Sequence, residues 1–152
     1  MKRVHGLAAI LAVVAGAGAA MALDAPAAIK ERQDFYKDLG KSMKGLGEQL
    51  KSSSPNVAEL KTFSASIDAA APKIPALFPA GTGPEAGVKT GAKAEIWQKP
   101  DEFKKDAADM AAAAHALNVA AQSGDAAAVK DAAGKLGETC KGCHQTFREK
   151  EH

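Results

Sequence analysis

The sequence predicts an all-α protein, an antiparallel four-helix bundle with one long crossover loop between the second and third helices. Alanine is abundant, aromatic residues make up 5% of the chain, and Val, Ile and Thr form no alternating strand-like runs. Apolar residues instead recur every three or four positions in four segments. Two short links and one long one join these segments, and short links imply antiparallel neighbours.

The helical segments are expected at about 27–50, 55–71, 101–122 and 125–150. Their buried stripes are expected to include Ile29, Tyr36, Leu39, Met43, Leu46, Leu50, Val57, Leu60, Ile67, Phe103, Ala107, Met110, Ala114, Leu117, Ala121, Val129, Ala133, Leu136, Cys140, Cys143 and Phe147. Ser54 is expected to cap the second helix, with Pro55 as its first residue. Gly124 should stop the third helix, and Asp125 should cap the fourth.

The crossover loop is expected from Pro72 to Pro100, a stretch that holds five of the seven prolines in the chain and many glycines. Phe78, Ile96 and Trp97 are the apolar residues that could anchor it to the core. A loop of this length is often functional.

The N-terminus has the layout of a secretory signal peptide over residues 1–22. Lys2 and Arg3 precede an apolar run, and the small residues around Met21 fit a cleavage site, which predicts export to the periplasm and one domain over 23–152. The run is weakly hydrophobic for a membrane anchor. The whole chain has 20 basic and 18 acidic residues, so without the signal the charges balance. With no basic stripe, neither nucleic acid nor, after cleavage, a membrane is an expected partner.

The segment Cys140-Lys141-Gly142-Cys143-His144 holds the only two cysteines of the chain. On a helix, both thiols and the imidazole fall within about 100° of arc, so all three are expected to face the bundle interior. Two thiols one turn apart can add to the two vinyl groups of a porphyrin, and the adjacent imidazole can then bind its iron. The sequence therefore predicts one covalently bound haem c with His144 as the axial iron ligand.

Three other interpretations of the two cysteines are open. A thioredoxin-like dithiol usually lies at a helix N-terminus beside a βαβ unit, whereas this pair lies late in a helix. A zinc site would need further ligands, most often Cys or His. A disulfide between residues three apart in a helix has poor geometry. His115 is expected at a helix boundary or on the surface.

Other side chains have two interpretations each. Arg32 stands in an apolar stripe, so its charge needs a partner, either a haem propionate or water at the end of the bundle. Tyr36 could face the second side of the iron or be an ordinary core residue. Arg148 could meet a propionate or be a solvated cation at a helix end. Met43 and Met110 could be sixth ligands, with core packing as the default.

The chain resembles the cytochrome c′ family, the class II cytochromes c, over nearly the whole exported sequence. The resemblance is carried by four segments, Ile29–Gln33, Phe78–Thr82, Glu95–Trp97 and Cys140–Arg148. It implies His144 as the proximal ligand, Arg32 and Gln33 near the propionates, Arg148 near the proximal face, and Tyr36 as the residue that shields the distal face.

The resemblance also implies a function. A periplasmic monohaem cytochrome of this kind is not an enzyme; it transfers one electron, or binds NO and CO at a five-coordinate, high-spin iron. A homodimer formed through the first two helices is expected, with redox partner proteins left open. The alternative is a low-spin electron carrier with a methionine ligand, against which Tyr36 at the distal position argues.

Overall fold

The computed structural model describes residues 24–150, and the predicted all-α four-helix bundle is confirmed. Its long helices are α1 (Ala25–Lys51), α2 (Val57–Ala70), α4 (Pro100–Ser123) and α5 (Ala126–Phe147). Three short helices lie in the crossover segment, η1 (Ala71–Leu77), η2 (Pro84–Ala86) and α3 (Glu95–Gln98). The expected signal peptide lies outside the described residues. Within residues 24–150, no helix is both long and apolar enough to cross a bilayer.

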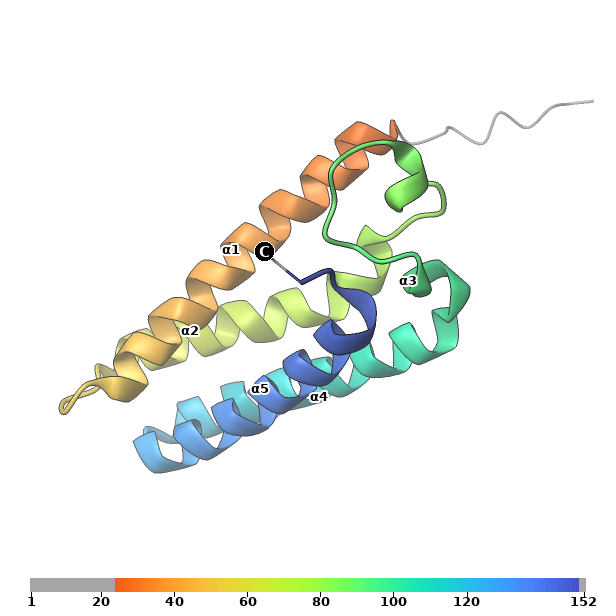
Figure 1. Ribbon diagram of the computed structural model, residues 1–152. Helices are drawn as coiled ribbons and strands as arrows, with labels where there is room; N and C mark the ends of the chain where they lie inside the picture. Colours follow the sequence, from red (N-terminus) through yellow and green to blue (C-terminus); the bar gives the residue numbers. More distant parts are fainter. Residues whose placement is uncertain (1–23, 151–152) are drawn as a thin grey trace, which may run out of the picture.

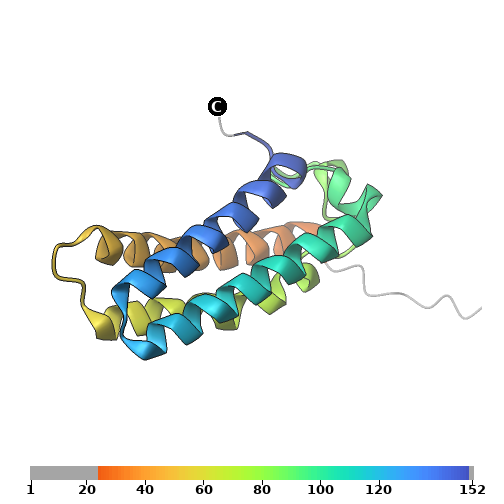
Figure 2. The same ribbon diagram turned by 90° about the horizontal axis from the view of Figure 1, so that it is seen from below.

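The four long helices pack in sequence, α1 against α2, α2 against α4, and α4 against α5 (Figures 1 and 2). The two short links lie together at one end of the bundle, and the crossover segment lies at the other. Most of the apolar side chains predicted to be inward form the core between these helices; those with at most 2% exposure are Ile29, Leu46, Leu60, Ile67, Ala114, Leu117, Ala121, Val129 and Leu136.

The start of α2 differs from the prediction. Asn56, not Ser54, is the cap: its side-chain oxygen accepts hydrogen bonds from the second and third helical N–H groups at 3.0 and 3.3 Å. Its own N–H donates to Gln49 at 2.9 Å, so the turn is tied back to α1. The helix therefore begins at Val57 and not at Pro55. At this first helical position Val57 is 40% exposed instead of buried.

The link between α4 and α5 is as predicted. Gly124 ends α4 with a φ of 77°, a left-handed conformation that glycine adopts without a steric penalty. Asp125 then caps α5, since its carboxylate accepts from two backbone N–H groups at 2.8 and 3.3 Å. These two residues hold the hairpin that carries the cysteine motif.

The crossover segment is an ordered structure with short helical turns rather than an irregular loop. Its predicted anchors are all in contact with the core. Ile96 is 4% exposed, and the Trp97 indole donates to the carbonyls of Phe78 and Pro79 at 3.2 and 3.1 Å. Phe78 in turn packs edge-on against Phe103 of α4, with 5.0 Å between ring centroids.

Helix α5 ends at Phe147, three residues before the predicted end. The chain after it leaves the helix and pairs with the crossover segment, as an antiparallel bridge between Ala92 and Arg148. The Lys93 N–H donates to the Phe147 carbonyl at 3.0 Å, and the N–H of the residue after Arg148 donates to Gly91 at 2.9 Å. These bonds replace the helical ones and fix the segment that follows the cysteine motif.

Candidate functional site

The cysteine motif lies in the last two turns of α5. Cys140 and Cys143 are half-buried free thiols that pack against the core, as predicted. His144 was also predicted to face the interior, but it is exposed, because it lies at the edge of the buried face of α5. Burial raises the pKa of both thiols, that of Cys143 to about 11, with the nearby Asp106 of α4 as a further cause for Cys143. Both side chains are therefore neutral thiols at neutral pH, with free sulfur atoms aligned along one helix face.

An open cavity of about 620 Å³ lies along this helix and the chain that follows it. This volume is in the range of cofactor and ligand sites. Three basic residues and one acidic residue are among those that line it, so its charge is net positive in a nearly neutral chain. The lining residues are Gly137, Cys140, Lys141, His144, Gln145, Arg148, Glu149 and Lys150.

Tyr36 faces the cysteines from α1. It is half-buried, and burial raises the pKa of its phenol, with the Cys143 thiol as the next cause. Two aromatic rings flank it: Phe35 lies edge-on at a centroid distance of 5.5 Å, and Phe78 lies tilted at 6.3 Å. The side of α1 that faces the cysteines is therefore an aromatic wall.

The predicted residues Tyr36, Cys140, Cys143 and Arg148 are brought together although α1 and α5 are far apart in sequence. Cys140, Cys143 and Arg148 are among the groups that influence the pKa of Tyr36, which indicates that they lie in the same region of the bundle. His144 is exposed as a residue, yet desolvation lowers the pKa of its imidazole, and Arg148 lowers it further. Its neutral form is thus favoured.

Arg32 and Gln33 both point to the crossover segment. Arg32 is 3% exposed, so it does not reach water, and its guanidinium donates to oxygens of Leu77, Thr82 and Thr90. Gln33 is exposed and donates to the Lys89 carbonyl at 3.0 Å. A place near propionates for these two residues stays a prediction.

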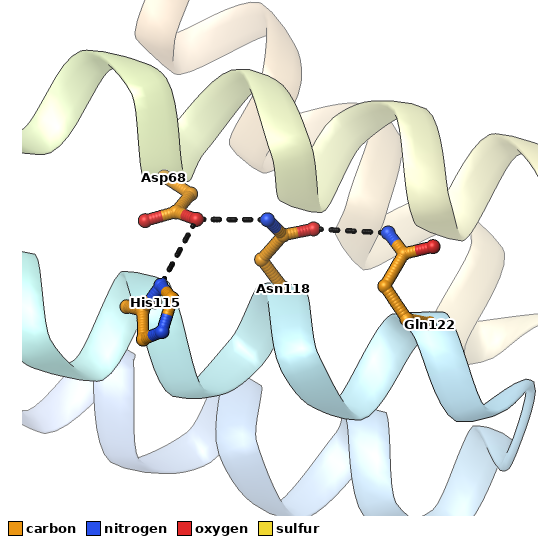
Figure 3. A network of polar contacts seen from close by, with 4 residues as sticks. All are labelled: Asp68, His115, Asn118 and Gln122. Atoms are coloured by element: carbon orange, nitrogen blue, oxygen red, sulfur yellow. Dashed lines mark hydrogen bonds and ion pairs between the residues drawn. The ribbon is translucent and has the colours of Figure 1, made fainter.

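The remaining candidates lie elsewhere in the bundle. Met43 and Met110 are half-buried and pack against the core. His115, predicted at the surface, has a side chain that is 70% exposed and lies 3.3 Å from Asp68 of α2. The same carboxylate accepts from Asn118 at 2.8 Å, and Gln122 extends the network along α4 (Figure 3). This network joins α2 to α4 and does not include the cysteine helix.

Two residues near the cysteines were missed in the sequence. Asp106 is close enough to Cys143 to raise its pKa, and Phe35 packs on Tyr36. Asp106 immediately precedes Ala107 of the buried α4 stripe, so its position at the edge of that stripe was an available signal. Phe35 had no such signal, because it lies between the predicted inward positions of α1.

The family model for Cytochrome C' matches residues 27–148, which include Arg32, Tyr36, the cysteine motif and Arg148. The chain belongs to the cytochrome c′ family. It is 46% identical over 122 residues to a cytochrome c′ of Pararhodospirillum photometricum, covering 80% of this chain and 95% of that one. It is 35% identical over 149 residues to the cytochrome c′ of Rhodospirillum rubrum, covering 97% and 99%.

Solved structures of cytochrome c′ have the same fold. The crystal structure from Thermochromatium tepidum has a TM-score of 0.77 at 33% identity and covers 83% of this chain and 97% of that one. A nitric oxide complex of a cytochrome c′ variant from Alcaligenes xylosoxidans has a TM-score of 0.74 at 25% identity, covering 84% and 97%. The cytochrome c′ family implies that the cofactor is a haem c.

The residues present fit such a cofactor. Two free thiols and an imidazole lie together on one helix, beside a cavity of suitable volume. The basic residues Lys141, Arg148 and Lys150 along that cavity suit a group with carboxylates. Across from the thiols, Tyr36 offers a flat aromatic surface for a ring system.

Proposed function

We propose that this cytochrome is exported to the periplasm, carries one covalently bound haem c, transfers single electrons, and binds NO and CO. The observation that carries the proposal is the position of Tyr36 opposite the half-buried Cys140 and Cys143 thiols. The role is that of a carrier and gas binder, not an enzyme. Redox partner proteins would supply and remove the electron.

The cysteines and the histidine divide the work of holding the cofactor. Cys140 and Cys143 would each form one thioether, and His144 would be the axial iron ligand. When bound, the haem supplies an iron that changes oxidation state by one electron and takes a small gas as a further ligand. A ligating imidazole must be deprotonated at the ligating nitrogen, and the lowered pKa of His144 beside Arg148 favours that neutral form.

Tyr36 would shield the opposite face without binding the iron. Phenolate is the ligating form of tyrosine. Burial raises the pKa of Tyr36, so its phenol stays protonated at neutral pH and is a poor ligand. With Phe35 and Phe78 around it, this side is bulky and largely apolar, which suits an uncharged diatomic gas.

The comparisons support the finer points of this proposal to different degrees. The Alcaligenes xylosoxidans structure is a nitric oxide complex, which supports NO as a ligand. Another neighbour, at a TM-score of 0.77 and 33% identity, is a cytochrome c′ with ligand-controlled dimer dissociation. It supports a homodimer, which we place on the outer faces of α1 and α2.

The alternative with Met43 as a sixth ligand would make the protein a low-spin electron carrier. Met43 is two turns beyond Tyr36 on α1, about 10 Å along the axis, so the two residues cannot lie over one iron. The thiol neighbours of Tyr36 favour Tyr36 for that position. A non-haem dithiol protein is the other alternative.

Absorption spectra of the exported protein test the proposal. We expect a broad high-spin Soret band in the oxidised and dithionite-reduced states that shifts on addition of CO or NO. A sharp low-spin reduced spectrum that ignores both gases would replace the proposal by the Met43 carrier. A protein without a Soret band would leave the dithiol alternative.

Replacing Tyr36 by alanine should open the distal side and increase the association rates of CO and NO. Tyr36→Phe is the matched control, because it keeps the ring and removes the hydroxyl, and its rates should stay near those of the unmodified protein. Flash photolysis of the CO complex and stopped-flow mixing with NO measure both. Equal rates in Tyr36→Ala and Tyr36→Phe would show that Tyr36 does not shield the gas site.

A further inference from the structure

Both terminal nitrogens of the Arg32 guanidinium donate hydrogen bonds to the crossover segment. Nη1 donates to the Thr82 hydroxyl at 3.1 Å and to the Leu77 carbonyl at 3.4 Å. Nη2 donates to the Thr82 carbonyl and to the Thr90 hydroxyl, both at 2.9 Å. The four N–H groups of the two terminal nitrogens therefore have one acceptor each, and all four acceptors are neutral oxygens.

These bonds draw two separate parts of the crossover segment onto one side chain. Leu77 and Thr82 belong to its first half, and Thr90 to its second. The Thr82 hydroxyl also donates to Pro79 at 2.8 Å, and the Thr90 hydroxyl accepts from the Ala92 N–H at 3.2 Å. In each half of the segment, the threonine that binds Arg32 also makes a local hydrogen bond to a nearby main-chain group.

The same guanidinium lies over aromatic rings. Its central carbon is 4.6 Å from the ring centroid of Phe78 and 6.0 Å from that of Trp97. A cation over a ring face at the shorter distance is attracted to it, and burial of the pair strengthens the attraction. Phe78 also packs on Tyr36, so Arg32 is linked to Tyr36 through one intermediate side chain.

We infer that Arg32 is a positioning residue that closes the crossover segment and holds Phe78 against Tyr36, so that it controls how readily a small ligand reaches the Tyr36 side of the site. The control of ligand entry rests on the proposed function, whereas the closing of the segment does not. The competing role is that predicted from the sequence, in which Arg32 serves as a positive charge for haem carboxylates.

Two substitutions of Arg32 distinguish the role of its several hydrogen-bond donors from the role of its positive charge. Arg32→Lys keeps the positive charge but has one ammonium group, which cannot reach acceptors in both halves of the segment. Arg32→Gln removes the charge as well. If Arg32 closes the segment, the two variants should behave alike. If it acts as a counter-charge, Arg32→Lys should resemble the unmodified protein.

A third substitution tests the acceptor side without changing Arg32. Thr90→Val removes one hydroxyl that accepts from the guanidinium and leaves the charge in place. It should loosen the segment in the same direction as Arg32→Lys, and by less. It also keeps the inference testable if an Arg32 variant fails to fold. Lys37→Ala, which removes an exposed cation from the same helix, is the matched control.

Hydrogen–deuterium exchange of the haem-loaded protein is the first measurement. In Arg32→Lys and Arg32→Gln, amides of residues 78–92 should exchange about tenfold faster or more, because several hydrogen bonds to a charged donor are lost. Amides of α4 should be unchanged, and Lys37→Ala should have no effect. Unmodified exchange over 78–92 in Arg32→Lys, or in Thr90→Val together with Arg32→Gln, would overturn the inference.

Association of CO with the same variants is the second measurement. Rates should increase severalfold in both Arg32 variants and less in Thr90→Val. Faster exchange with unaltered CO rates would overturn the control of ligand entry. A protein that binds no gas in any form would instead contradict the proposed function, and the exchange data would still decide whether Arg32 closes the segment.

Discussion

A variant with Cys140 and Cys143 both replaced by alanine should contain no covalently bound haem. Each thiol is proposed to form one thioether, and the chain has no other cysteine. Haem staining of a denaturing gel and intact-protein mass spectrometry measure this directly, because only a covalent adduct survives denaturation. Each single variant should keep one thioether and give an intermediate yield.

Substitutions at exposed residues on the same helix serve as controls. Lys135→Ala and Glu138→Ala change exposed positions of α5 that do not line the cavity and carry no proposed bond to the cofactor, so their haem content should match the unmodified protein. Covalent haem in the double cysteine variant would refute the assignment of both thiols. Loss of haem in the control variants as well would point to a general defect in folding or export.

Replacing Leu117 by alanine should give the largest loss of stability among the substitutions considered. Leu117 is 0% exposed and lies on α4, which packs between α2 and α5. Removing a buried leucine side chain leaves a cavity and costs about 2–5 kcal/mol of unfolding free energy. Denaturant unfolding of the haem-loaded protein, followed by far-ultraviolet circular dichroism, gives the difference.

Val119 supplies the matched control on the same helix. It is 57% exposed, so Val119→Ala should change the unfolding free energy by at most about 0.5 kcal/mol. A cost for Leu117→Ala no greater than that of Val119→Ala would mean that Leu117 is not part of a tightly packed core, and the arrangement of α2, α4 and α5 would need revision.

The long helices could be predicted because their information is local. Spacing by three and four residues fixed the buried faces, and Gly124 and Asp125 carry backbone and capping preferences of their own. The predicted start of α2 was wrong because serine and asparagine are equally good N-cap residues, so local preference does not separate Ser54 from Asn56. The hydrogen bond from the Asn56 N–H to Gln49, which belongs to the preceding helix, is not visible in local preference.

The crossover segment could be predicted only as a set of anchors. The partners of Arg32 are 45, 50 and 58 residues away from it in the chain, and no local pattern gives such pairs. The early end of α5 has the same cause, since the bridge between Ala92 and Arg148 competes with the last helical turn. The sequence therefore did not reveal which residues far apart in the chain form hydrogen bonds with one another.

In the candidate site, too, the residues of a local motif could be predicted from the sequence, whereas contacts between distant helices could not. Cys140, Cys143 and His144 lie within two turns of one helix, so a local sequence motif was enough to identify them. The role of Tyr36 could not be identified from a local motif, because it depends on where α1 lies relative to α5. Its inward position was predicted from periodicity, whereas its place in the same region as the cysteines follows from the packed bundle.

The way the crossover segment is held has a consequence for variation among relatives. Most of its fixing bonds end on main-chain carbonyl oxygens, which every residue type offers alike. Exposed side chains between Pro84 and Lys89 should therefore tolerate substitution, while an insertion or deletion would shift every bonded atom at once. The bonded main-chain groups of the segment are the carbonyls of Leu77, Phe78, Pro79, Thr82, Lys89 and Gly91 and the N–H of Lys93. Outside the side chains that bind Arg32 or pack on the core, length rather than residue identity should be the constrained property of this segment.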